Sequence, residues 1–153
     1  MSILKVDTLQ PATGARVLSA GHVVQVVQGT STASATLGSN NTHVDSGLTA
    51  TITPTSATSK VLVLHSSSIV FQGNADYILR LVRGSTVVYQ LNFYNNGSTL
   101  SNMTGAFQFF DSPATTSATT YKTTNYKNAG ELYYNYNNEV SSTSTLTLME
   151  IAQ

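Results

Sequence analysis

Short runs in which apolar and polar residues alternate dominate this chain, and clusters of Gly, Asn, Ser and Pro separate them. A period of two indicates half-buried β-strands, and the runs are rich in Val, Ile, Thr, Tyr and Phe, which suit a pleated surface. No stretch places apolar residues at i, i+3, i+4 and i+7 over three turns, so we expect no helix. The predicted strands cover residues 23–27, 48–53, 60–64, 77–82, 86–93, 105–110, 118–124, 132–136 and 143–151.

This number and length of strands is typical of two packed sheets. We therefore predict an all-β fold, an antiparallel two-sheet sandwich that is jelly-roll-like. Runs 77–82 and 86–93 flank a turn centred on Gly84, which predicts a hairpin. Run 60–64 is nearly continuously apolar, which predicts a strand buried on both faces.

The last strand is apolar on both of its faces. Alternation places Leu146 and Leu148 on one side and Met149 and Ile151 on the other. Such a strand lies between two layers or between two subunits. Together with a small, charge-poor domain, this pattern predicts a homo-oligomer, and we expect a homotrimer.

The beginning of the chain differs from the rest. Residues 1–20 hold one strand-like run and then a Pro/Gly break at residues 11–14, which is too little to bury a core of its own. We predict that residues 1–20 form an N-terminal anchor and that residues 21–153 form the sandwich. The anchor would attach to its partner through Leu4, Val6 and Leu9. The alternative is an ordinary first strand of the sandwich, since terminal strands often dock in sheets.

Composition narrows the function classes. Charged residues make up 9% of the chain and the net charge is zero, whereas Thr, Ser and Asn together fill 54 of 153 positions. So few charges produce only a weak electrostatic field, which argues against nucleic-acid binding. No apolar stretch approaches the roughly 20 residues that span a bilayer, so we expect no membrane insertion. The absence of Cys excludes disulfides and thiolate chemistry, and oligomerisation is the usual other source of stability.

The residues that could perform chemistry show no catalytic or metal-binding pattern. His22, His43 and His65 lie far apart in sequence. A metal site formed by His43, Asp45 and His65 is conceivable, but solvated or hydrogen-bonded histidines are favoured. No spacing selects the pair of carboxylates that a glycosidase needs, and the turn contexts of Asp76 and Asp111 favour capping of their own backbone. We predict no catalytic residue, no metal and no cofactor, and thus a protein that is not an enzyme.

One combination of residues suits binding. Tyrosines and asparagines crowd two segments, where rigid rings supply contact area and amides supply hydrogen bonds to a glycan or protein. The alternative is that the tyrosines line ordinary amphipathic strands. The candidate receptor-binding residues are Tyr94, Asn95, Asn96, Tyr133, Tyr134, Tyr136, Asn137 and Asn138.

Several segments of the sequence resemble segments of structural and tail-fibre proteins of marine phages, including cyanophages. They are residues 109–121 (FFDSPATTSATTY), residues 47–54 running into 59–63, the ending 146–151 (LTLMEI) and the opening 4–10 (LKVDTLQ). The resemblance implies a β-sandwich subunit of a homotrimeric virion part and carries over no catalytic residue. The chain has no long shaft, which favours a short fibre or a fibre tip.

We therefore expect a virion structural protein that is made in the host cytoplasm and exposed on the particle. Its partners would be copies of itself, other tail or capsid proteins, and a host cell-surface glycan or protein. The alternative is a capsid decoration or head-fibre protein that coats or stabilises the particle without binding a receptor. A carbohydrate-degrading tailspike is disfavoured by the missing carboxylate pair.

Overall fold

The computed structural model describes residues 19–38, 41–97, 100–136 and 142–153, which fold as two antiparallel β-sheets packed face to face. The described residues form strands and no helix, so the predicted all-β sandwich is confirmed. None of them forms a helix that could cross a membrane. The strands are β1 (Val23–Ser31), β2 (Ala35–Thr36), β3 (Val44–Ile52), β4 (Lys60–Gln72), β5 (Ala75–Arg83), β6 (Thr86–Asn95), β7 (Ser101–Asp111), β8 (Thr119–Lys127), β9 (Glu131–Tyr134) and β10 (Ser144–Ile151).

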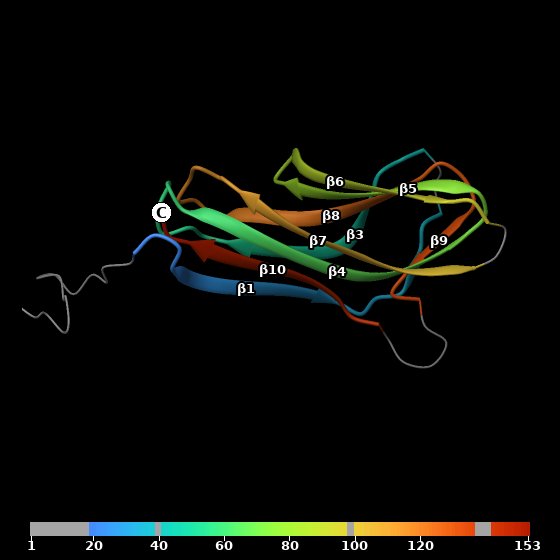
Figure 1. Ribbon diagram of the computed structural model, residues 1–153, viewed down its shortest axis with the longest axis horizontal. Coiled ribbons are helices and arrows are strands. Elements are labelled where there is room, and N and C mark those ends of the chain that lie inside the picture. The colour runs from blue at the N-terminus through green and yellow to red at the C-terminus, as the bar shows by residue number, and fades with distance from the viewer. Residues whose placement is uncertain (1–18, 39–40, 98–99, 137–141) are drawn as a thin grey trace, which may run out of the picture.

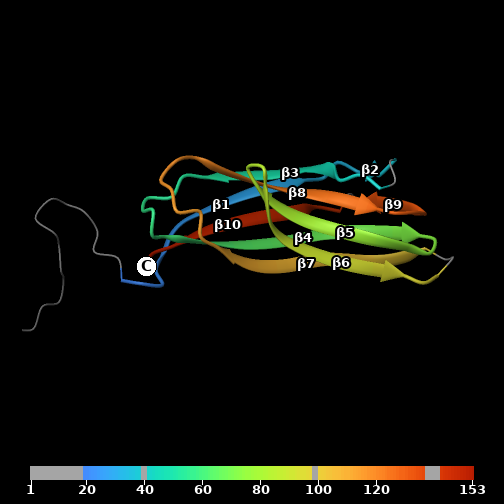
Figure 2. The same ribbon diagram turned by 90° about the horizontal axis from the view of Figure 1, so that it is seen from above.

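The order of the strands is that of a jelly roll. Sheet A runs β1-β10-β4, with β7 beside β4, and carries the short β9 and β2 at one end; sheet B runs β3-β8-β5-β6. If β2 and β9 are left out, eight described strands remain, and they pair as β1 with β10, β3 with β8, β4 with β7 and β5 with β6. The first strand thus pairs with the last, and each inner pair lies within the next outer one. Nested pairs of this kind result when one long antiparallel ribbon is rolled into two sheets. Figure 2 looks onto sheet B, which overlies sheet A.

Local sequence explains most strand boundaries. The predicted hairpin is confirmed, because β5 and β6 pair antiparallel and Gly84 turns between them with φ of 57°. β4 is longer than predicted, at 13 residues, and alternates in burial. Leu62 and Leu64 are only half-buried on the outer side of sheet A, so the prediction that this run is buried on both faces was wrong.

The core lies between the sheets. Leu146 and Leu148 of β10 are fully buried there, while Met149 lies half-buried on the outer side, as the alternation predicted. At one long edge of the sandwich the backbones of β1 and β3 meet, and a Cβ on Gly29 would lie 1.9 Å from the carbonyl oxygen of Thr49. At the other long edge, aromatic rings of β6 and β7 fill the space. The two edges therefore close by different means.

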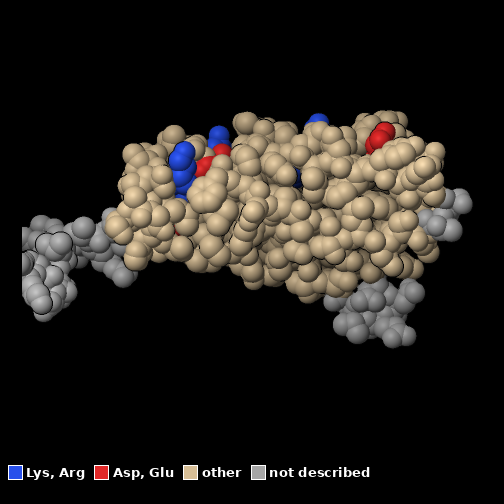
Figure 3. Space-filling view, viewed as in Figure 1, with Lys and Arg blue, Asp and Glu red and all other residues tan. Residues whose placement is uncertain are grey.

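The two outer faces differ in charge. Across sheet A, Val26, Met149, Leu62 and Phe110 are register partners on four neighbouring strands and form an apolar row, with Val26 55% and Phe110 56% exposed. Among the described outward positions of these four strands, only Lys60 is charged. In Figure 3 the charged side chains lie mostly in the upper half of the view, and the lower part over sheet A is nearly without them. We call this surface the neutral face.

The predicted anchor lies mostly outside the described residues. Residues 1–18, with Leu4, Val6 and Leu9, are not among them. The chain enters the sandwich beside its C-terminal residues, because Gly21 N donates to the carbonyl oxygen of Ala152 at 2.8 Å and Ala152 N donates to that of His22 at 2.9 Å. This pairing fixes residues 19–22 at one end of the sandwich (Figure 1).

Candidate functional site

The two Tyr- and Asn-rich segments lie at the same end of the sandwich. Both views place the end of β6 and the short β9 away from residues 19–22 and the C-terminus (Figures 1 and 2). The turn after β4 links them, because Gln72 pairs with Glu131 of β9 and the carbonyl oxygen of Gly73 accepts a bond from Asn95 Nδ2 at 3.0 Å. We call this end of the molecule, with its turns at residues 72–75, 95–97 and 128–131, the tip.

Close backbone packing fixes the shape of the tip. Gly73 and Gly130 both have positive φ, and a Cβ on Gly130 would lie 2.3 Å from the carbonyl oxygen of Gln72. Lys127 Nζ donates to the carbonyl oxygen of Gly130 at 2.7 Å, and Asn128 Nδ2 donates to the carboxylate of Asp76 at 2.6 Å. The turns therefore hold one another, so that side chains directed outward from them have defined positions.

The first segment divides into one structural and two exposed residues. Tyr94 is 62% exposed and Asn96 is also exposed. Asn95 is half-buried, and its Oδ1 accepts a bond from Gly97 N at 3.2 Å while its Nδ2 bonds Gly73. Tyr94 and Asn96 are thus available to a ligand, whereas Asn95 shapes the turn that presents them.

The second segment divides in the same way. Tyr133 and Tyr136 lie on the outer side with ring centroids 5.0 Å apart, and the Tyr133 hydroxyl donates to the carboxylate of Glu131, which raises the pKa of this phenol. Tyr134 is half-buried against the core, and burial raises the pKa of its hydroxyl. The predicted residues Asn137 and Asn138 lie outside the described residues.

Asn135, between these tyrosines, is a structural residue. It is 2% exposed and adopts a positive φ of 51°. Its Nδ2 donates to the carbonyl oxygens of Ser31 at 3.0 Å and Ala33 at 3.2 Å, and its Oδ1 accepts from Ser144 Oγ at 2.6 Å. This side chain connects β9 to the ends of β1 and β10. The Tyr and Asn content of the sequence could not separate such a residue from its exposed neighbours.

The histidines are dispersed. His22 is exposed, and the rings of His43 and Tyr126 lie 5.0 Å apart. His65 lies inside the sandwich, where burial lowers its pKa to about 4. Its Nε2 lies 3.0 Å from Ser67 Oγ, and Ser67 Oγ lies 3.3 Å from the carbonyl oxygen of Gly105. No group of three His, Asp or Glu residues that could hold a metal occurs within the described ranges.

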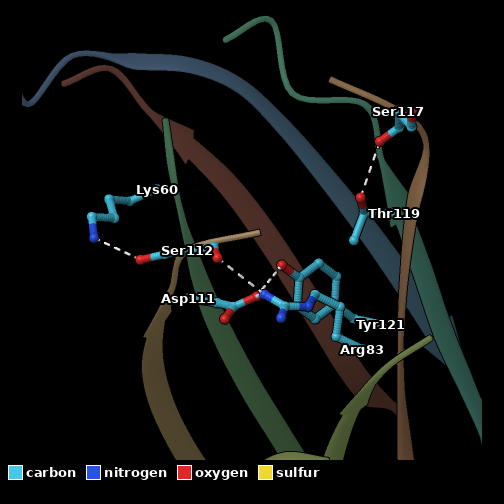
Figure 4. Close-up of polar contacts among 7 residues, drawn as sticks. All are labelled: Lys60, Arg83, Asp111, Ser112, Ser117, Thr119 and Tyr121. Carbon is cyan, nitrogen blue, oxygen red and sulfur yellow. Dashed lines mark hydrogen bonds and ion pairs between the residues drawn. The ribbon is translucent and has the colours of Figure 1, made fainter. Parts of the chain in front are cut away.

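Two buried carboxylates bond across strands. Asp111 Oδ2 accepts from Arg83 Nη1 at 2.7 Å and from the Tyr121 hydroxyl at 2.6 Å, which joins sheet A to sheet B (Figure 4). The expectation that Asp76 and Asp111 cap their own backbone was therefore wrong, since Asp76 bonds Asn128 in the turn after β8 and Asp111 bonds Arg83 of β5. The side chain of Glu150 is 0% exposed and accepts bonds from Gln25 and Thr55.

The outward side chains of the tip are mainly tyrosines and asparagines. Exposed rings provide flat apolar surface, and the neighbouring amides provide directional hydrogen bonds, a combination used in adaptable binding surfaces. No protein-family model and no curated protein sequence matches this chain. The argument for function therefore depends on the geometry of the chain itself.

Proposed function

We propose that this protein is a structural subunit of a phage virion, a short fibre or fibre tip, which attaches through residues 1–20 and directs its Tyr- and Asn-rich tip outward. One observation carries the proposal. The exposed Tyr94 and Asn96 stand at the end of β6, and Tyr133 and Tyr136 stand in β9 or just after it. The ends of these two strands lie opposite the end where the chain enters (Figure 1). A subunit held at its entry end would present the tip to a host cell-surface glycan or protein.

The fold agrees with this proposal. Jelly rolls recur in viral capsid and lectin domains. The same architecture also serves unrelated functions, so fold alone selects none of them. The jelly roll gives the molecule two distinct ends, because its strands run the length of the sandwich between the entry of the chain and the tip.

The neutral face supports the proposed homotrimer. Covering a nearly uncharged face with a second copy removes apolar surface from water and strips few charges of their solvent. β1 is also the edge strand of sheet A, and its Val23 and Val26 are exposed. Edge strands with exposed apolar residues are common sites of self-association unless they are covered.

Decoration of a capsid is the second candidate, and the neutral face favours it as well. A subunit that coats a particle needs a broad surface against its neighbours and no receptor contact. The two candidates differ in the position of the protein on the particle and in whether the tip touches the host.

The proposal is tested by deleting residues 2–18 in the encoding phage genome and imaging the particles by cryo-electron microscopy. We expect the shortened protein to fold, with urea unfolding like that of the full chain, and to be missing from the particles. Density for the full chain at the tail would support a fibre, and density on the capsid would support decoration. If the shortened protein is still incorporated, or if it cannot fold, residues 1–20 are not a separable anchor.

A further inference from the structure

The outer face of sheet B contains a groove away from the tip. Register aligns Asp45 of β3, Thr124 of β8 and Arg80 of β5 in one row across the sheet. His43 and Lys122 also line the groove, which has a volume of about 430 Å³. Small-molecule sites fall between roughly 300 and 1,000 Å³, so the groove has the size of a ligand site.

The charges in the groove do not cancel. Lys122 Nζ lies 2.8 Å from Asp45 Oδ2, so these two side chains form an ion pair. Arg80 Nε donates to Gln90 Oε1 at 2.7 Å, and no carboxylate of the described residues lies within ion-pair distance of its guanidinium. The groove therefore holds one uncompensated cation. The planar fork of a guanidinium matches the two oxygens of a carboxylate.

Two polar atoms of residues that line the groove are buried without a hydrogen-bond partner among the described residues. Thr124 is 8% exposed, and its Oγ1 has no hydrogen-bond partner within the described part of the chain. The same is true of His43 Nδ1. Burial and the charge of Arg80 lower the pKa of His43, so at neutral pH the ring contributes hydrogen bonding but no charge. Buried polar atoms are nearly always bonded in folded proteins. Both atoms are closed to solvent, so a ligand hydroxyl reaches them only after a rotation of the side chain.

A polar ladder leads out of the groove along β6. Gln90 Nε2 donates to Asn92 Oδ1 at 2.8 Å, and alternation puts Gln90, Asn92 and Tyr94 on the same outer side. From Gln90 to Tyr94 the strand advances about 14 Å. This surface of amides ending in an exposed ring suits an extended polar chain better than a single small molecule.

We propose that this groove binds an acidic oligosaccharide, with the carboxylate of a uronic acid unit at Arg80 and the hydroxyls of that unit at Thr124 and His43. Further sugar units lie along Gln90 and Asn92. One uncompensated cation is too little for a polyphosphate, which requires many neutralising contacts. The site is a property of the folded chain and does not depend on the function proposed above.

The test is titration of the full chain with trigalacturonate. Calorimetry measures the affinity, and the chemical shifts of backbone amides in NMR map the site. Maltotriose is the neutral control and inorganic phosphate is the bare anion control. We expect shifts at residues 43–45, 80, 90–94 and 122–124, with no comparable binding of maltotriose or phosphate. If maltotriose binds equally well, if only phosphate binds, or if the shifts lie elsewhere, the proposal is overturned.

Three variants make the test specific. Arg80→Gln removes the charge and should weaken trigalacturonate binding at least tenfold, and Thr124→Val removes the hydroxyl at constant shape and should weaken it about threefold. Lys60→Gln removes a cation from the side of sheet A and should leave binding unchanged. Equal binding by the parent and a folded Arg80→Gln variant would contradict the site. If Arg80→Gln does not fold, the shift map of the parent decides.

Discussion

The two outer faces of this sandwich obey the same alternation but expose different chemistry. On sheet A, outward positions hold Val26, Leu62 and Phe110 and, among described residues of its four long strands, no charge beyond Lys60. On sheet B, the outward row holds Asp45 and Arg80. Transfer of a charge out of water is costly unless a partner is supplied, whereas transfer of apolar surface is favourable. The neutral face is therefore suited to a second copy, and the charged face to water or to a charged ligand.

The largest change in the free energy of unfolding is expected where the two sheets are held together, because neither outer face forms without that packing. A Cβ on Gly29 would lie 1.9 Å from the carbonyl oxygen of Thr49, which is backbone and cannot rotate away. Gly29→Ala should therefore lower the free energy of unfolding by about 3 kcal/mol or more. Urea unfolding measures the change. Gly38→Ala is the matched control, since nothing lies within 4 Å of a Cβ there, and equal stability of the two variants would contradict the close approach.

A smaller change in the free energy of unfolding is expected on acidification, through the histidine buried between the two sheets. Unfolded His65 takes up a proton near its ordinary pKa of 6.5, but in the folded protein burial lowers this pKa to about 4. Between these values the unfolded state binds more protons, so the free energy of unfolding decreases as the pH falls, by about 3 kcal/mol from pH 7 to pH 4.

Urea unfolding between pH 6.5 and 5 reports mainly the histidines, because carboxylates titrate mainly at lower pH. His43, whose pKa is also lowered, contributes in the same direction, so the contribution of His65 is the difference between the parent and a His65 variant. His65→Gln should reduce the dependence on pH, whereas His22→Gln, at an exposed position, should leave it as in the parent. A His65→Gln variant with the same slope as the parent would show that another group is responsible.

Local patterns in the sequence predicted the parts of the fold that depend on neighbours along the chain. The hairpin around Gly84 and the alternation of β10 were both correct, because turn conformation and the direction of successive side chains are set within a few residues. The two-residue strand β2 was missed, since Ala35 and Thr36 carry no periodic signal of their own and pair only with β9.

The candidate sites depended on information that the sequence does not contain locally. The row of Asp45, Thr124 and Arg80 comes from three strands, and only their register brings these residues together. At the tip, composition identified two tyrosine- and asparagine-rich segments, and the fold places them at the same end of the sandwich. Composition could not predict that Asn135 is buried while Tyr136 is exposed, because burial there follows from contacts with Ser31 and Ser144.

A third prediction concerns self-association and tests the difference between the two outer faces directly. If copies associate through the neutral face, Val26→Glu places a charge in the contact and should weaken association at least tenfold, so that light scattering reports monomers at micromolar concentration. Val26 is 55% exposed, so stability should change by less than about 0.5 kcal/mol. Thr51→Glu introduces the same charge at an exposed position on β3, the edge strand of sheet B, and should leave the oligomer intact. A parent protein that is already monomeric would refute the proposed trimer.

The smallest effect is expected at the tip, where each contact is weak alone. Tyr94 is 62% exposed, so Tyr94→Ala should change the free energy of unfolding by less than about 0.5 kcal/mol. Loss of the ring should reduce the binding of the oligomer to host cells several-fold, because three weak contacts act together and each is lost in every copy. Leu100→Ala is the control, since Leu100 is 57% exposed just beyond the same segment and has no ring to stack on a ligand. Cell binding is measured by flow cytometry with labelled protein, after urea unfolding has shown that both variants fold. If Tyr94→Ala binds like the parent and like Leu100→Ala, the ring is not a receptor contact, and decoration of the particle becomes the better account of this sandwich.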